Sequence, residues 1–428
     1  MTRHEPFLTL STLDDLLLDV ATEIDLSAAD WRIMENRFRK LKTHLERPSS
    51  PLAPFLKDGI SLIYAQGSIA TSTTIISGID DDRFDVDAIV EINVPAHWSE
   101  HHTLDMLEDA LRGFPGVIKI VRCTRCIQLQ FAFMHMDVTI MDRSKRVAVA
   151  RAGDVLHAPD KGPCARIPSN PWGFTAWFRS TVGIGQTAFA EALRKRRALN
   201  AKSRLRPLDD IELALAKADQ VDLPPMIPSA IDAQEAVALK LLKRHLNIRY
   251  QKLTPKRPPS IYFTKRAGSI GYISEGLTAQ ILVLAGSTAH ILRAHLAAGT
   301  RPNELNPSYP PDRLNDRWPA DGQKGIQDME TLAGVLEALA DKLARIARAP
   351  LSEIVAGIRE LFGEHIGEEV ATLVTKRFDT RGNSAANLVQ TATGNIKSPT
   401  IGTVARDVRP VPSHKFHPMH FGEDDDAD

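Results

Sequence analysis

The sequence predicts an α+β protein with two lobes, a small mixed-sheet lobe and a helical lobe, and three observations support this prediction. The chain has 428 residues, which is long for one compact domain. Alternating and apolar runs typical of strands gather between residues 60 and 142. Helical spacing of apolar residues governs the sequence on both sides of this region.

Residues 1–55 are expected to form helices that bridge the two lobes. Ser27 suits a helix N-cap, and apolar residues then recur at helical spacing from Trp31 to Leu45. A run rich in proline and serine at 47–54 ends this element.

Residues 56–180 are expected to form the sheet lobe. The runs ISLIYAQ and FDVDAIVEINV have the pattern of strands, and two more β-rich runs cover 116–126 and 127–141. A helix is predicted over 170–181, with Pro171 in its first turn, where the missing N–H is not needed.

Residues 181–375 are expected to form the helical lobe that completes a cleft. Three of its helices are predicted at 230–249, which is amphipathic, at 273–298 and at 327–347. The stretch 301–319, rich in proline and asparagine, predicts a long loop. Residues 376–428 lose periodicity and end in the acidic run GEDDDAD, which predicts a polar, disordered tail.

Charge and composition restrict the partners. Lys and Arg number 53 and Asp and Glu number 53, so the net charge is zero and no stable complex with long nucleic acid is expected. We find no uncharged apolar stretch of about 20 residues, the length of a membrane helix, so no membrane is expected. Acidic residues near the start do not fit a signal peptide, and three cysteines do not form a disulfide framework. Together these features predict a cytoplasmic protein.

Two aspartates, Asp85 and Asp87, are the first candidate metal ligands in the sequence. Asp85 and Asp87 lie two positions apart in a strand-like run, so both carboxylates point to the same face. Like charges at that spacing are costly unless a cation lies between them, and Mg²⁺ is the natural ion for hard oxygen ligands and a phosphate substrate. An isolated Asp-x-Asp more often marks a surface strand with two solvated acids, so further residues are needed to decide.

Two additional motifs supply them. Gly67 and Ser68 follow an apolar run; glycine lets the backbone approach a phosphate closely, and serine at a helix start offers donors. Asp137 lies in a second strand-like run, MHMDVTI. A third carboxylate from a neighbouring strand would complete a two-metal site and serve as a base for an attacking hydroxyl.

These motifs resemble the polymerase-β-like nucleotidyltransferase superfamily. The stretch QGSIATSTTI…DDRFDVDAIVEI is similar to the bacterial CD-NTases, the cyclic oligonucleotide synthases related to DncV and to animal cyclic GMP-AMP synthase. Matching stretches run from about residue 60 to 363 and include HMDVTIMD, SNPWGFTAWF, PPSIYFTKRAG and ELFGE.

The resemblance implies a bilobed polymerase-β-like nucleotidyltransferase fold, with 56–180 as its catalytic core. It implies attack of a ribose hydroxyl on a nucleoside triphosphate, with release of pyrophosphate. Asp85, Asp87 and Asp137 would be the catalytic residues and would bind two Mg²⁺ ions, with Mn²⁺ as an alternative. Gln66, Gly67 and Ser68 would contact the nucleotide.

The resemblance also implies phosphate contacts from the helical lobe. A lysine of the helix at 230–249 and a serine after the next loop would touch the triphosphate, which matches Lys240 or Lys243 and Ser260. The sequence does not choose between the two lysines. The alternative is an amphipathic helix whose basic face is solvated.

Two other motifs favour structural interpretations. Cys123 and Cys126 have the spacing of a zinc knuckle, but a structural zinc site needs four ligands, so cysteines of a strand core are favoured. The basic run 194–206 lacks aromatic residues and is interpreted as a helix surface.

The predicted function is therefore a cyclic oligonucleotide synthase that makes a cyclic di- or trinucleotide messenger, with ATP among its substrates. The family context implies CBASS antiphage defence, a downstream effector that the messenger activates, and a regulatory partner at the C-terminal tail. Alternatives are an RNA-end adenylating or protein-nucleotidylating enzyme, or a catalytically silent nucleotide-binding module.

Overall fold

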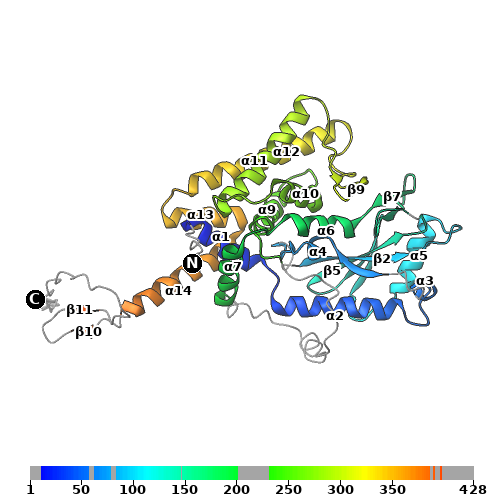
Figure 1. The fold of residues 1–428 in the computed structure, drawn as a ribbon, viewed down its shortest axis with the longest axis horizontal. Coiled ribbons are helices and arrows are strands. Elements are labelled where there is room, and N and C mark those ends of the chain that lie inside the picture. The colour runs from blue at the N-terminus through cyan, green and yellow to red at the C-terminus, as the bar shows by residue number, and fades with distance from the viewer. Residues whose placement is uncertain are drawn as a thin grey trace, which may run out of the picture. The chain divides into compact units, whose positions relative to one another are not determined.

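The computed structural model describes residues 11–56, 62–78, 83–145, 147–200, 231–385, 389–390 and 396–397. Contacts within the chain divide it into two units, Met1–Val370 and Ala371–Asp428. The first unit contains the sheet and the helices that pack around it (Figure 1).

Within the described residues, seven strands form one mixed sheet. The strand order is β1-β2-β5-β4-β3, and β6 joins β5 to β7. Strands β2 and β5 are parallel, and the other neighbours are antiparallel. The bounds are β1 Ile63–Gln66, β2 Phe84–Ile92, β3 Lys119–Arg122, β4 Ile127–Gln130, β5 Met134–Asp142, β6 Gly153–His157 and β7 Ala165–Ser169.

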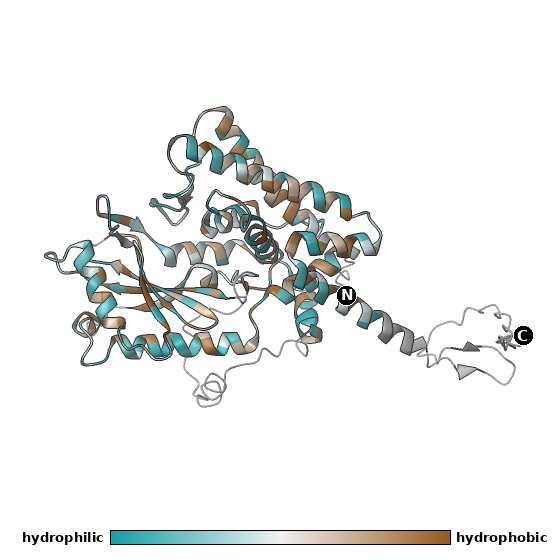
Figure 2. Cartoon of the chain, turned by 180° about the vertical axis from the view of Figure 1, so that it is seen from behind, coloured by the Kyte–Doolittle hydropathy of each residue, from teal (hydrophilic) through white to brown (hydrophobic). Residues whose placement is uncertain are grey.

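Alternation along β2 and β5 separates an apolar face from a polar face. Val86 and Ala88 in β2, and Met136 and Val138 in β5, are fully buried. Figure 2 shows hydrophobic colouring along the strands of the sheet and mixed hydrophobic and hydrophilic colouring on the helices. Because side chains alternate with a period of two, burying these positions sends the intervening acids to the opposite face.

The sheet lobe includes, among its described residues, the helices α3 Ala53–Leu56, α4 Gly67–Ala70, α5 Glu100–Leu111 and α6 Pro171–Thr181. Helix α6 begins as predicted, since Asn170 caps it by accepting a hydrogen bond of 2.8 Å from Gly173 N and Pro171 occupies the first position.

The N-terminal helices are α1 Thr12–Ile24 and α2 Ala28–Leu45. Ser27 caps α2 in a capping box with Asp30, which confirms the predicted start. Helix α1 contacts helices of the helical lobe, whereas α2 contacts α5 of the sheet lobe. The two helices therefore pack against different lobes.

The helical lobe is formed by α7 Thr187–Asn200, α9 Gln234–Tyr250, α10 Ser260–Ile270, α11 Leu277–Ala297, α12 Gly322–Ile346 and α13 Leu351–Phe362. Helix α11 is long and apolar enough to cross a membrane by length and composition. Its buried side chains, among them Leu284 and Leu292, lie where it packs against α9 and α12, as in the core helix of a lobe.

The predicted loop 301–319 carries two short strands, β8 Leu305–Asn306 and β9 Tyr309–Arg313, and connects the lobes. The Asp312 carboxylate accepts a hydrogen bond of 2.8 Å from Asn170 N, and Ser308 donates to Gly173 O at 2.7 Å. These contacts place the loop against the start of α6.

Most of the predicted tail lies outside the described residues. Helix α14, Glu364–Ala385, extends into it, and β10 Val389–Gln390 pairs with β11 Ile396–Lys397.

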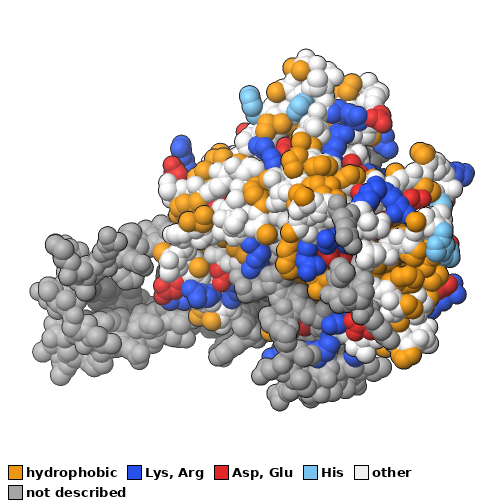
Figure 3. All heavy atoms as spheres, turned by 45° about the vertical axis from the view of Figure 1, so that its right-hand side comes forward, with side chains coloured by type: hydrophobic (Ala, Val, Ile, Leu, Met, Phe, Trp, Pro, Cys, Tyr) orange, Lys and Arg blue, Asp and Glu red, His pale blue; other side chains and the backbone are white. Residues whose placement is uncertain are grey.

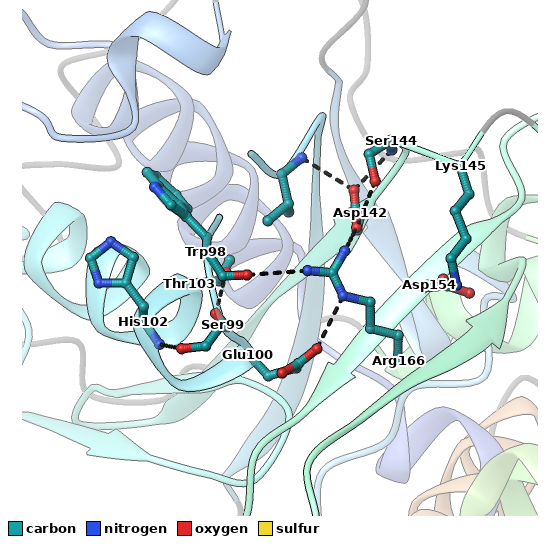
Figure 4. A network of polar contacts seen from close by, with 11 residues as sticks. Trp98, Ser99, Glu100, His102, Thr103, Asp142, Ser144, Lys145, Asp154 and Arg166 are labelled. Carbon is teal, nitrogen blue, oxygen red and sulfur yellow. Dashed lines mark hydrogen bonds and ion pairs between the residues drawn. The ribbon is translucent and has the colours of Figure 1, made fainter. Parts of the chain in front are cut away.

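A buried ion pair fastens the far end of β5 to β7. Asp142 accepts hydrogen bonds from Val94 N at 3.1 Å and Ser144 N at 2.8 Å, and it pairs with Arg166. Arg166 also donates to Glu100 at 3.1 Å (Figure 4). Because the Asp142 carboxylate is 1% exposed, these partners replace water in stabilising its negative charge.

We expect Asp142→Ala to lower the free energy of unfolding by about 3 kcal/mol, because it leaves the buried Val94 N–H without its acceptor and takes from Arg166 one of its two carboxylate partners. Urea denaturation followed by circular dichroism measures this. Arg112→Ala is the control: Arg112 pairs with Asp109 at 3.2 Å with both side chains at least half exposed, so a loss of less than about 0.5 kcal/mol is expected. Equal losses in the two variants would contradict the assignment.

Candidate active site

The polar face of the sheet brings the three predicted acids together. In the parallel pairing of β2 and β5, Asp87 is the direct partner of Asp137, and Asp85 is the partner of His135. Neighbouring strands lie about 4.8 Å apart, so Asp87 and Asp137 are adjacent across the ladder. Gln66 stands on the other side of Asp87.

Crowding perturbs the two inner carboxyls. Burial, and then the charges of Asp137 and Asp85, raise the pKa of Asp87 to about 7. Burial also raises the pKa of Asp137, with Asp85 acting in the same direction. Asp85 is the outlying member, since its side chain is 77% exposed and faces His135 Nδ1 at 3.6 Å. Simultaneous ionisation of two adjacent carboxyls is unfavourable because the carboxylates repel each other. A cation bound between them would reduce this repulsion.

Gly67 occupies a position that only glycine fits. Its φ of +63° lies in the left-handed region, and a Cβ there would stand 2.2 Å from Asp87 Oδ2. The backbone of the turn after β1 therefore packs directly against the side chain of Asp87. Ser68 follows in α4, where its Oγ accepts a hydrogen bond of 3.0 Å from Thr74 Oγ1.

Helix α9 differs from the amphipathic helix that the sequence predicted. All residues from Gln234 to Leu246 are buried, and this includes Lys240, Lys243 and Arg244. The alternative of a solvated basic face is therefore wrong. Three donors of α9 bind carbonyls of the loop after Ser68: Lys243 Nζ to Thr73 O at 2.7 Å, Arg244 Nη1 to Ile76 O at 3.2 Å, and Asn247 Nδ2 to Ser77 O at 3.0 Å.

The two lysines have different surroundings. Lys240 Nζ lies 2.6 Å from Asp25 Oδ1. Burial alone would raise the pKa of Asp25, but Lys240 and Arg197 hold this pKa below its usual value. Burial, then repulsion by Arg257 and Lys240, lowers the pKa of Lys243 to about 7, while Asp87 opposes that shift. The charge of Lys243 therefore acts on Asp87, whereas Lys240 is engaged by Asp25, the residue that caps the end of α1.

Arg257 is a site residue that the sequence analysis missed. It donates to Ser260 Oγ at 3.4 Å and hydrogen-bonds to Asn247. Removal from water lowers the pKa of Arg257, and the charge of the Asp85 carboxylate opposes this shift. The available signal was an arginine three positions before Ser260 in the loop that enters α10.

The carboxylates of Asp85, Asp87 and Asp137 are suitable ligands for a metal ion, and binding of the ion would draw them together. Within the part of the chain that the structure describes, no three His, Cys, Asp or Glu side chains already converge as a metal site. The donor set is nevertheless of the kind that Mg²⁺ takes, carboxylates carried by two paired strands. Asp87 and Asp137 are the inner pair, and Asp85 supplies a more accessible third carboxylate.

The structure corrects the interpretation of the cysteines. Cys123 and Cys126 flank the turn between β3 and β4 and are not part of a strand core; Cys123 N donates to Cys126 O at 2.9 Å. The Cys126 thiol hydrogen-bonds to Asp137. The turn therefore adjoins the acid cluster.

The described part of the basic run 194–206 has a structural role. Arg196 pairs with Asp15 and Asp19 of α1, and Arg197 pairs with Asp25 and Asp232. Figure 3 shows Lys and Arg side chains interspersed with acidic and apolar ones over the face in view. Residues 201–206 lie outside the described residues.

Comparison with known proteins identifies clear relatives. No family model matches the sequence. The cyclic dinucleotide synthase CdnG of Bradyrhizobium diazoefficiens is 32% identical over 377 residues, which cover 86% of this chain and 84% of the relative. The structure of the CD-NTase CdnG of that organism in complex with GTP matches with a TM-score of 0.70 at 30% identity, over 85% of this chain and 99% of that one.

A more distant structure shares the fold alone. The CdnC:HORMA-deltaN complex of E. coli MS115-1 matches with a TM-score of 0.51 at 13% identity, over 82% of this chain and 96% of that one.

The raised pKa of Asp87 predicts how the metal-free protein responds to pH. The unfolded carboxyl titrates near 3.8 and the folded one near 7, so the folded state holds its proton more tightly. Stability is therefore lost as pH rises between these values. We expect Asp87→Asn to stabilise the metal-free protein at pH 8 by about 2 kcal/mol, below the ceiling set by about 1.4 kcal/mol per pKa unit.

Urea denaturation in the presence of a chelator, at pH 5 and pH 8, measures this difference. The gain should shrink at pH 5, where wild-type Asp87 is mostly protonated. Asp160→Asn, at an exposed position, serves as the control. A gain that is the same at both pH values, or that Asp160→Asn reproduces, would refute the interpretation.

Proposed function

The chain belongs to the CD-NTase family of nucleotidyltransferases, and on this premise we propose that it joins GTP and ATP into a cyclic dinucleotide. It is an enzyme and a cyclic oligonucleotide synthase. GTP is proposed because the related CdnG structure contains it, and ATP because the sequence resemblance implies it. A cyclic trinucleotide is the alternative product.

One observation carries the proposed site: Asp87 and Asp137 are direct partners across parallel strands, beside a glycine turn that a Cβ would block. We propose Asp85, Asp87 and Asp137 as the ligands of two Mg²⁺ ions, or of Mn²⁺. When bound, the ions would neutralise charge on the triphosphate and make the ribose hydroxyl more acidic.

The remaining residues position the reactants. The backbone at Gln66 and Gly67 and the Ser68 hydroxyl line one side of the proposed triphosphate site, while Lys243, Arg257 and Ser260 line the other. Asp137, whose pKa is raised by burial, is suited to accept the proton of the attacking hydroxyl. Catalysis in phosphoryl and nucleotidyl transfer consists mainly of such positioning and charge neutralisation.

We further propose that the product is a messenger in CBASS antiviral defence, made in the cytoplasm and sensed by a downstream effector. The HORMA complex of the distant CdnC supports a search for a regulatory partner of this chain as well. The competing functions are adenylation of an RNA end and nucleotidylation of a protein, and these differ in where a radiolabel from ATP is found.

We expect Asp87→Ala and Asp85→Ala to reduce product formation by at least about a thousandfold, because each removes charge from the metal site. Purified protein is incubated with Mg²⁺, RNA and an equal mixture of the four nucleoside triphosphates that includes radiolabelled ATP, and the products are identified by mass spectrometry after phosphatase treatment. Asp160→Ala is the control. Label that appears only in RNA or protein, or full activity in both variants, would reject the proposed function.

Substitution of Lys243 and substitution of Lys240 should have different effects on KM and on stability. We expect Lys243→Met to raise KM for the triphosphate about tenfold, since it removes a cation beside the acids. Lys240→Met should leave KM unchanged and instead lower stability by about 3 kcal/mol, because it leaves Asp25 with one cation fewer in a buried position. Initial rates and urea denaturation of both variants measure this. The reverse pattern would assign the phosphate contact to Lys240.

A further inference from the structure

We propose that Gln128 is a positioning residue for Asp137, which holds one carboxylate oxygen by an amide hydrogen bond and so leaves the other oxygen for the metal. This inference rests on the proposed function, because it concerns the carboxylate that we assign to the metal and the attacking hydroxyl. Gln128 itself would touch neither the substrate nor the ion.

The position of Gln128 follows from strand register. In the antiparallel pairing of β4 and β5, Gln128 is the direct partner of Asp137, as Asp87 is on the opposite side in β2. Direct cross-strand partners present their side chains on the same face of the sheet. Asp137 is therefore flanked by an acid on one side and an amide on the other.

The contact itself is short and well defined. Gln128 Nε2 donates to Asp137 Oδ1 at 2.9 Å, a normal distance for a hydrogen bond to a carboxylate. An amide N–H is a donor to an ionised carboxylate and adds no charge to the site. It can therefore fix the carboxylate without competing with a metal ion.

A second glutamine fixes the direction of the first. Gln130 Nε2 donates to Gln128 Oε1 at 2.8 Å. Because the oxygen of the Gln128 amide is thereby engaged, its nitrogen is the end that faces Asp137. Gln130 is the register partner of His135, which faces Asp85, so the two glutamines run along the acid cluster as a polar edge.

The geometry gives the amide a specific task. Repulsion from Asp85 and Asp87 would turn a free Asp137 carboxylate away from its neighbours, and with it the lone pairs that a metal needs. A hydrogen bond from the opposite strand opposes this rotation. Partners of this kind commonly change metal affinity or activity about 10- to 100-fold when they are removed.

The test uses Gln128→Met, which keeps the length of the side chain and removes the donor. In the full-length protein we expect kcat to fall about 10- to 100-fold with KM for the triphosphate changed less than threefold. Independently of turnover, we expect Mn²⁺ binding to the nucleotide-free protein, measured by electron paramagnetic resonance, to weaken by at least about tenfold.

Two further variants make the result decisive. Gln130→Met leaves Gln128 in place but removes its orienting donor, so a smaller loss in the same direction is expected, and it serves if Gln128→Met does not fold. Arg122→Met, on the neighbouring strand β3, removes a pairing with Asp105 of α5 on the face of the sheet opposite Gln128, and it should leave kcat and Mn²⁺ affinity unchanged.

Normal kcat and normal Mn²⁺ affinity in Gln128→Met would overturn the proposal, as would equal losses in Arg122→Met. A wild-type protein that forms no nucleotide product would instead reject the proposed function, and the Mn²⁺ measurement would still decide the role of Gln128.

Discussion

The parallel pairing of β2 with β5 is the constraint on which the site depends. Burial of Val86 and Ala88 in one strand, and of Met136 and Val138 in the other, fixes the register of that pair. A slip of one residue would expose this apolar set and bury the acids. Hydrophobic packing on one face thus maintains an electrostatically unfavourable arrangement of carboxylates on the other.

The helical lobe provides positive charge opposite the acids through Lys243. Burial disfavours the charged form of this lysine and of Asp87. The pKa of Asp87 is raised to about 7, and that of Lys243 is lowered to about 7, in each case chiefly by burial. An ion between the acids and a phosphate beside the lysine would favour the charged form of both groups. These shifts therefore favour the binding of a cation and an anion together.

Local patterns predicted the elements whose role depends on neighbours in sequence. Asp85 and Asp87 share a face because of strand periodicity, and Gly67 was recognisable from the end of an apolar run. Contacts distant in sequence could not be predicted in this way. The choice between Lys240 and Lys243 depends on Asp25, more than 200 positions away in the chain, and Gln128 has meaning only through its cross-strand partner.

Three hydrogen bonds from α9 to the carbonyls of Thr73, Ile76 and Ser77 attach the loop after the glycine turn to this buried helix. Movement of this loop relative to α9 would have to break these hydrogen bonds. Protein engineers who wish to alter nucleobase preference should therefore leave α9 intact and vary segments that do not join it to the turn.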